Sequence, residues 1–179
     1  YGEGEAPKPI TQIAGLSRLR KLSLYGPLEL TGALAELSLE RLILNRVPLT
    51  HLEEVSSQTA LRELYLEDVA LTSLKGAEQL SALETLRIDG AELTNLSPLA
   101  ALSNLVRLEF RHIPGLRSLE GLEPHTRLEQ FTAYDVPIES LIPLSGANGI
   151  EILSVGDSEL TSLDGLQGKL ALDSLTVRG

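Results

Sequence analysis

The sequence is built from one unit that repeats along most of its length. The pattern L-x-x-L-x-L, in which other apolar residues replace some of the leucines, recurs in eight registers, and successive openers are 20, 22, 22, 22, 23, 22 and 22 residues apart. The openers are Leu19, Leu39, Leu61, Leu83, Leu105, Leu128, Ile150 and Leu172. A fixed period of roughly 20–50 residues is typical of solenoids, in which each unit packs only against its neighbours. This repeat therefore constrains the fold more than any other feature.

Each unit has two halves with different periods. Apolar residues alternate in the first half, as at Leu64 and Leu66, and this period of two predicts a short strand. In the second half they recur every third residue, as at Leu93, Leu96 and Leu99. A step of three fits 3₁₀ turns better than a regular α-helix. One unit cannot bury both apolar rows alone, so we expect stacked units that form a parallel sheet backed by turns.

These features resemble the leucine-rich-repeat family, and specifically its 22-residue class found in internalin-like bacterial surface proteins. The resemblance covers residues 10–179. It implies an α/β leucine-rich-repeat solenoid, with a curved parallel β-sheet on the concave face and 3₁₀ or irregular turns on the convex face. One feature of the family is absent, namely the asparagine eight residues after the opener. Those positions hold Pro27, Val47, Val69, Ala91, Ile113, Val136 and Ser158, so the turn amides need other partners.

The domain organisation follows from the repeat. We expect residues 1–9 to be a linker or tail and residues 10–179 to be the leucine-rich-repeat domain. That domain contains a partial repeat over 10–18, then about seven full repeats and a final strand. The chain begins with Tyr1 and has no methionine, which predicts a fragment of a longer protein.

Composition and motifs argue against several kinds of chemistry. The chain has no cysteine, which removes disulfides, thiolate catalysis and zinc–thiolate sites. Its net charge of −10 disfavours nucleic acid and anionic membranes as partners. No phosphate-binding loop, metalloprotease motif or nucleophile elbow is present, and no apolar run approaches a membrane span. We therefore expect no enzyme activity, no cofactor and no metal site, and the sequence leaves the cellular compartment open.

Two groups of polar residues are candidate sites. His112 and Asp135 are expected to form a surface ion pair between adjacent units, because no nucleophile accompanies them. Acidic residues gather near the strand ends, but they spread over several units instead of converging on one point, which a calcium site requires. We interpret them as a solvated acidic edge; they are Glu67, Asp68, Asp89, Asp135 and Asp157.

The concave face is predicted from the second, fourth and sixth positions after each opener. Three of the four tyrosines fall there, whereas both phenylalanines fall at inward positions. The same positions hold six basic and four acidic residues, a mixture that suits a protein partner better than a phosphate backbone. Tyrosine and arginine are enriched at binding hot spots. We therefore predict a partner-binding patch of Tyr25, Arg41, Ile43, Tyr65, Arg87, Arg107, Glu109, Arg111 and Tyr134.

The predicted function is protein–protein recognition through the concave sheet, with another protein as partner, no nucleic acid and no membrane insertion. The alternative is that the repeats form the ligand-sensing or autoinhibitory region of a larger signalling or immune-type switch protein. A third hypothesis is that they deliver substrate to a catalytic domain elsewhere in the chain.

Overall fold

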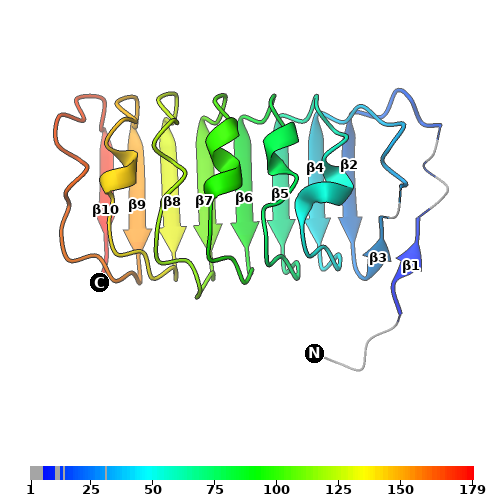
Figure 1. Cartoon of the computed structure of the whole chain (residues 1–179), viewed down its shortest axis with the longest axis horizontal. Coiled ribbons are helices and arrows are strands. Elements are labelled where there is room, and N and C mark those ends of the chain that lie inside the picture. The colour runs from blue at the N-terminus through cyan, green and yellow to red at the C-terminus, as the bar shows by residue number, and fades with distance from the viewer. Residues whose placement is uncertain (1–5, 11–12, 14, 31) are drawn as a thin grey trace.

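A single parallel sheet of eight strands runs the length of the molecule. The computed structural model describes residues 6–10, 13, 15–30 and 32–179. The strands lie side by side in chain order (Figure 1). They are β2 (Lys21–Tyr25), β4 (Arg41–Asn45), β5 (Glu63–Glu67), β6 (Thr85–Asp89), β7 (Arg107–Arg111), β8 (Gln130–Tyr134), β9 (Ile152–Gly156) and β10 (Ser174–Val177). Each strand belongs to one repeat, which confirms the expected solenoid.

The strands pair in register, so equivalent positions of successive units form straight rows across the sheet. Leu64 pairs with Leu86, and Leu86 pairs with Leu108. The leucines of these rows are buried, whereas the residues between them, such as Tyr65 and Arg87, are part-exposed on the opposite face. The alternation in the sequence therefore separates an inner from an outer side of the sheet.

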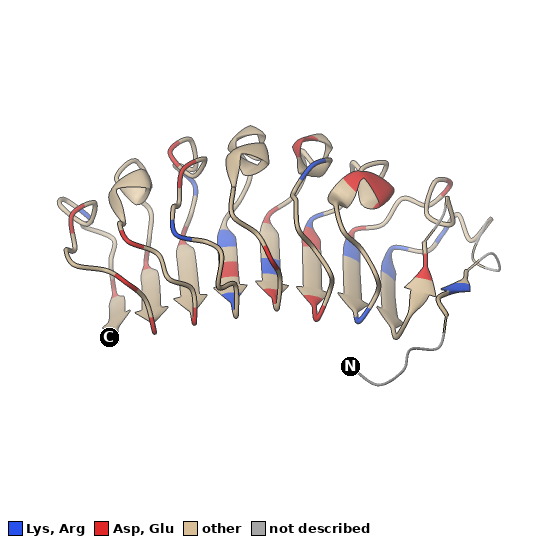
Figure 2. Cartoon of the chain, turned by 60° about the horizontal axis from the view of Figure 1, so that its bottom comes forward, with Lys and Arg blue, Asp and Glu red and all other residues tan. Residues whose placement is uncertain are grey.

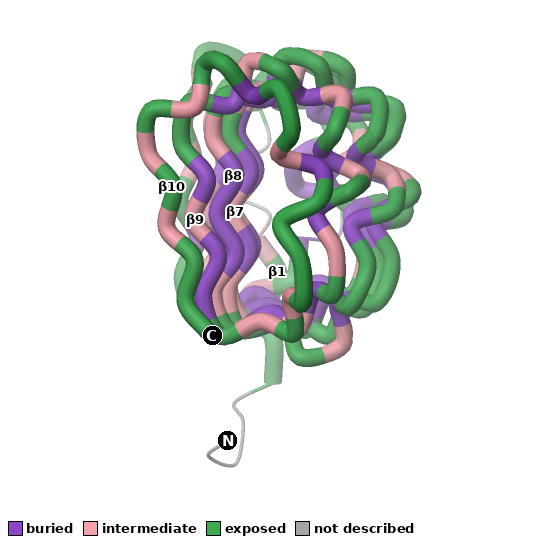
Figure 3. The backbone as a smooth tube through the Cα atoms, turned by 90° about the vertical axis from the view of Figure 1, so that its left-hand side faces the viewer, coloured by how far each residue is buried: buried purple, intermediate pink, exposed green. Residues whose placement is uncertain are grey.

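The second half of each unit forms turns that cover the inner side of the sheet (Figure 3). Within the described residues, four of these turns contain a 3₁₀ helix, as the step of three predicted: η1 (Leu52–Val55), η2 (Ala77–Gln79), η3 (Ser97–Ala101) and η4 (Ile142–Leu144). Leu93, Leu96 and Leu99 are fully buried, and Pro98 lies in the first turn of η3, where its missing amide costs no hydrogen bond.

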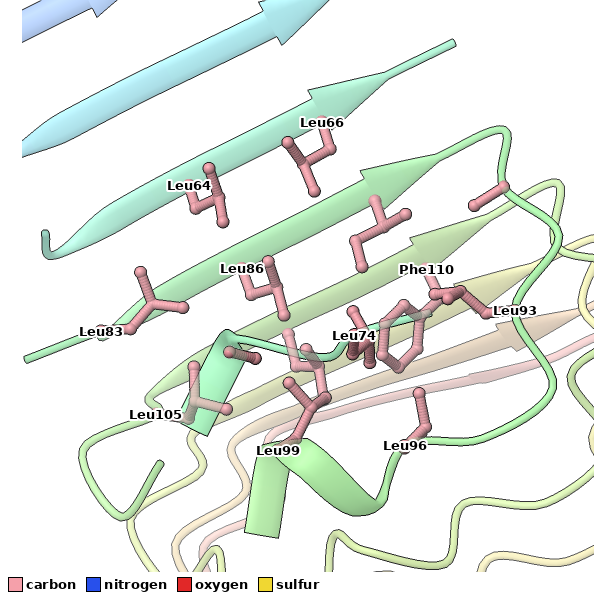
Figure 4. Close-up of a cluster of buried hydrophobic side chains, with 14 of the residues drawn as sticks. Leu64, Leu66, Leu74, Leu83, Leu86, Leu93, Leu96, Leu99, Leu105 and Phe110 are labelled. Atoms are coloured by element: carbon pink, nitrogen blue, oxygen red, sulfur yellow. The ribbon is translucent and has the colours of Figure 1, made fainter. Parts of the chain in front are cut away.

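The core lies between the sheet and these turns. It is made mainly of stacked leucines, each contributing about 1.5–3 kcal/mol by burial. Figure 4 shows leucines from the strands and from the back turns meeting around Phe110. The rings of Phe110 and Phe131 meet edge to face, with centroids 6.4 Å apart and planes at 76°. Both phenylalanines are completely buried, as expected from their positions.

The turn after each strand is stabilised without the asparagine ladder. In six successive units the residue that follows the strand takes a left-handed conformation, with φ between 50° and 73°. These residues are Arg46, Asp68, Gly90, His112, Asp135 and Asp157. In five of these units the amide of this residue donates to a carbonyl of the next unit, as from Asp68 to Asp89 at 2.9 Å. The ladder position itself is apolar and buried at Val69 and Ile113. Backbone acceptors thus replace the side-chain amides of the family.

Three buried polar side chains occupy one position of the back turn where other units have leucine or alanine. Gln58 accepts a hydrogen bond from the Leu39 amide at 3.0 Å. The ring nitrogens of His125 lie 3.0 and 3.1 Å from two backbone carbonyl oxygens. The ammonium of Lys169 donates to two carbonyls at 2.8 Å each, and burial lowers its pKa. Each therefore bonds with backbone groups that the turn presents to it.

The two ends of the sheet differ from its middle. Near the first unit, β1 (Lys8–Pro9) pairs in parallel with β3 (Leu28–Glu29), so part of the expected linker lies in a short second sheet. At the other end, Leu175 of β10 is 46% exposed. No helix in the described part of the chain is long and apolar enough to cross a membrane.

Candidate functional site

The solvent side of the eight-stranded sheet carries three rows of side chains, which we call the concave face. The strand register sets these rows, and each runs across the sheet. All nine residues of the predicted patch lie on this face, and Figure 2 shows acidic and basic positions side by side on its central strands. In β4 to β8 the three rows are Arg41, Glu63, Thr85, Arg107 and Gln130; Ile43, Tyr65, Arg87, Glu109 and Thr132; and Asn45, Glu67, Asp89, Arg111 and Tyr134.

Arg41, Glu63 and Tyr65 form one cluster on β4 and β5. The guanidinium of Arg41 lies 4.9 Å from the centroid of the Tyr65 ring and 3.3 Å from a Glu63 carboxylate oxygen. The Tyr65 hydroxyl donates to the same carboxylate at 3.0 Å. Burial and this hydrogen bond raise the pKa of Tyr65. The ring is therefore held between a cation and an anion, in a fixed orientation, before any partner arrives.

A second cluster links β6 and β7. Arg87 lies 3.3 Å from an Asp89 oxygen and 3.8 Å from a Glu109 oxygen. Arg111 donates to the same Glu109 oxygen. Two arginines thus share one glutamate, and this restrains all three side chains. Exposed ion pairs contribute only about 0–1 kcal/mol each to stability, so the consequence of this network is mainly geometric.

His112 extends this cluster at the end of β7. Its Nδ1 lies 2.7 Å from an Asp89 oxygen, so its hydrogen-bond partner is Asp89 and not Asp135 as predicted. The prediction of Asp135 as the partner was wrong: Asp135 lies in the following unit, whereas the His112 ring contacts the preceding one. The Asp89 carboxylate raises the pKa of His112. Burial alone would raise the pKa of Asp89, but hydrogen bonds from His112 and Arg87 outweigh it and lower that pKa.

Arg111 and Tyr134 stack at the boundary between β7 and β8. The Arg111 guanidinium lies 5.5 Å from the centroid of the Tyr134 ring. The same ring lies close to Gly156 of β9, where an added Cβ atom would come within 2.6 Å of a ring carbon. The absence of a side chain at Gly156 therefore leaves the space that the Tyr134 ring occupies.

Three predicted patch residues are not joined to these clusters. Ile43 is next to Tyr65 in the register but makes no polar contact. Tyr25 is 64% exposed and lies at the N-terminal edge of the sheet. Arg107 has no ion pair or hydrogen bond from its side chain within the described residues.

Glu63, Asp89 and His112 belong to the clusters although the predicted patch omitted them. Glu63 and Asp89 lie at the second and sixth positions after their openers, and the register places Glu63 beside Arg41 and Asp89 beside Arg111. A comparison of charges along the first row identifies Glu63, whereas Asp89 pairs with Arg87, two residues earlier on its own strand. His112 carries no such signal, because it follows the end of β7 and so lies outside the three rows.

The chemistry available on this face is that of recognition: charged hydrogen bonds, stacked rings and small apolar areas. Within the described part of the chain, no group of three or more histidines and acids is arranged to hold a metal ion.

The sequence matches no protein-family model, and it matches no curated protein either. Solved structures are similar to it in fold. Internalin C2 from Listeria monocytogenes superimposes with a TM-score of 0.86 at 24% identity, over 99% of this chain and 78% of that one. A leucine-rich-repeat protein from Leptospira interrogans gives 0.75 at 24% identity, over 97% of this chain and 52% of the other.

A more distant likeness is to a plant protein. The ectodomain of the receptor kinase GASSHO1/SCHENGEN3 from Arabidopsis thaliana, solved in complex with CASPARIAN STRIP INTEGRITY FACTOR 2, has a TM-score of 0.71 at 18% identity. The match covers 91% of this chain but only 21% of that ectodomain. Together, the similar structures and the in-register sheet with its 3₁₀ turns confirm that this chain has the leucine-rich-repeat solenoid fold of the internalin-like type.

Proposed function

We propose that this chain is a protein–protein recognition module that binds its partner through the concave face. The observation that carries the proposal is the ordered pair of arginine–tyrosine stacks, Arg41 on Tyr65 and Arg111 on Tyr134. Aromatic and arginine side chains dominate binding hot spots, and side chains that are already oriented lose less entropy on binding. The stacks lie on separate strands of one sheet, with the Arg87–Glu109 cluster between them.

The similar structures support the same kind of function. The plant receptor ectodomain with this fold was solved in complex with CASPARIAN STRIP INTEGRITY FACTOR 2, and a plant peptide hormone receptor, RGFR1, was solved in complex with RGF2. Solenoids present an extended surface built from many short units, which suits contact with a macromolecule. The alternative function, a sensing or autoinhibitory region of a larger switch protein, uses the same surface toward a domain of its own chain.

An affinity capture with three baits tests the proposal. The baits are the wild-type chain, a Tyr65→Ala, Arg87→Ala, Tyr134→Ala variant, and a control with three exposed side chains removed outside the concave face: Arg18→Ala, Gln79→Ala and Arg127→Ala. Circular dichroism establishes that all three are folded. We expect a protein bound by the wild type and the control but not by the concave variant. Equal capture by all three baits would refute the proposal.

A further inference from the structure

A small hollow lies on the concave face between the two arginine–tyrosine stacks. Its volume is about 140 Å³, and its lining includes Tyr65, Thr85, Arg87, Arg107, Glu109 and Gln130. Thr85 occupies the first row between Glu63 and Arg107, so a short side chain stands where the neighbouring strands have long ones. The hollow results from this difference in side-chain length.

The hydroxyl of Thr85 is buried without a hydrogen-bond partner among the described residues. The residue is only 7% exposed. A buried polar atom without a partner costs about 1–3 kcal/mol, and folded proteins rarely leave one in that state. Thr85 lines the hollow, so a change to another staggered χ1 rotamer would bring its hydroxyl within reach of an acceptor that enters there.

The charges around the hollow leave one cation unmatched. Four arginines lie on the concave side of β4 to β7, and three of them have acidic partners: Arg41 has Glu63, Arg87 has Asp89, and Arg111 has Glu109. Arg107 has none within the described residues, and the side-chain amide of Gln130 beside it in the row is also free of hydrogen bonds. The available groups are therefore a guanidinium, an amide and a hydroxyl, all of which donate hydrogen bonds.

We propose that this hollow is a subsite of hydrogen-bond donors that receives the carboxylate of an aspartate or glutamate side chain from the protein partner. The inference rests on the proposed function, and it adds the chemistry of the partner group. Planar guanidinium groups bind carboxylates with two parallel hydrogen bonds, which Arg107 is free to make. A volume of about 140 Å³ holds one side-chain carboxyl group and the methylenes behind it. The nearby acids are already neutralised by their own arginines, so they offer little repulsion to the incoming charge.

Selection from a random displayed peptide library tests the subsite. Peptides are selected on the wild-type chain, and those that compete at the concave face are recognised by their loss of binding to the Tyr134→Ala variant. We expect them to share an acidic residue at one fixed position. Replacing that residue by its amide, or making Arg107→Gln in the protein, should weaken binding at least tenfold. The two changes together should weaken it no further than either change alone.

Three controls make the outcome specific. Lys21→Gln removes an exposed cation from the same row away from the hollow, and it should leave the affinity unchanged. Thr85→Val should weaken acidic peptides by roughly twofold to tenfold, the effect of one hydrogen bond, while raising the melting temperature of the free protein. Inorganic phosphate, the other small anion that these donors could bind, should not displace the peptides.

Each contrary result has a distinct meaning. If concave-face peptides show no acidic preference, or bind Arg107→Gln as tightly as the wild type, the subsite is refuted while the proposed function stands. Displacement by phosphate also refutes a carboxylate subsite. If no selected peptide depends on Tyr134, the proposed function fails, and the subsite fails with it.

Discussion

Replacing Gln58 with leucine tests whether one side chain compensates for the irregular spacing of the repeats. In units of regular length, the amide of the opening residue donates to the carbonyl three residues before it, as from Leu61 and Leu83 at 2.9 Å each. The unit between the openers Leu19 and Leu39 is two residues shorter than most, and the hydrogen bond at its end differs. There the amide of Leu39 donates to the side-chain oxygen of Gln58 at 3.0 Å instead.

The magnitude follows from what the substitution leaves behind. Gln58 is 1% exposed, so Gln58→Leu leaves the Leu39 amide buried without a partner. The carbonyl of Leu34, which accepts from the Gln58 amide at 2.7 Å, keeps its bond with the amide of Leu37. One orphaned donor costs about 1–3 kcal/mol in free energy of unfolding. In a chain of this size that lowers the melting temperature by roughly 2–4 °C per kcal/mol.

The matched control is the reverse change at the equivalent position of the next unit. Leu80 is fully buried, and the amide of Leu83 already donates to the Leu80 carbonyl. Leu80→Gln therefore buries an amide with no waiting partner, and it should also destabilise the protein. Urea denaturation measures both variants, and hydrogen exchange follows the Leu39 amide. If hydrophobicity alone decided the outcome, Gln58→Leu would be as stable as the wild type, and the reasoning would be refuted.

Two further predictions concern backbone geometry and pH. Gly76 and Gly26 have nearly equal φ angles of 97° and 99°, but only at Gly76 would a Cβ atom meet backbone, within 2.5 Å of the Glu53 nitrogen. Gly76→Ala should therefore lower the melting temperature well beyond Gly26→Ala, whose cost is the left-handed strain of about 1–2 kcal/mol; equal losses would contradict the packing argument. The Asp89 carboxylate raises the pKa of His112 in the folded protein. The stability that this pair contributes is therefore fully present below the pKa of histidine in the unfolded chain, about 6.5, and is lost as pH rises through the pKa of His112 in the folded protein. Thermal melts of His112→Gln should differ from the wild type at about pH 6 and converge with it at higher pH, whereas a difference independent of pH would exclude the linkage.

The fold could be predicted from the sequence because the solenoid is specified locally. Each unit repeats the same apolar positions, so the register of Leu64 with Leu86 follows from alignment alone. The 3₁₀ turns follow in the same way from the step of three at Leu93, Leu96 and Leu99. Neither inference needs knowledge of contacts between distant parts of the chain.

The arrangement of the candidate site was only partly predictable. Row positions placed Tyr65 and Arg87 on one face, but side-chain rotamers decide that Tyr65 bonds with Glu63 and that Arg87 bonds with Asp89. Rotamers also decide the partner of His112: its ring contacts Asp89 of the preceding unit, whereas Arg46 at the equivalent position pairs with Asp68 of the following unit. The unpaired hydroxyl of Thr85 has no sequence signature, because satisfaction of a hydrogen bond is a property of the packed structure.

Site-specific photo-crosslinking tests the central claim, recognition through the concave face, most directly. A photoreactive phenylalanine at Ile43 reports contacts on that face, next to the Arg41–Tyr65 stack. The same group at Gln79, an exposed position in η2 on the turn side, is the matched control. After irradiation in extract of the source cells, we expect one defined protein to be joined at Ile43 and not at Gln79. Crosslinking of the same protein from Gln79 alone, or equally from both positions, would contradict recognition through the concave face.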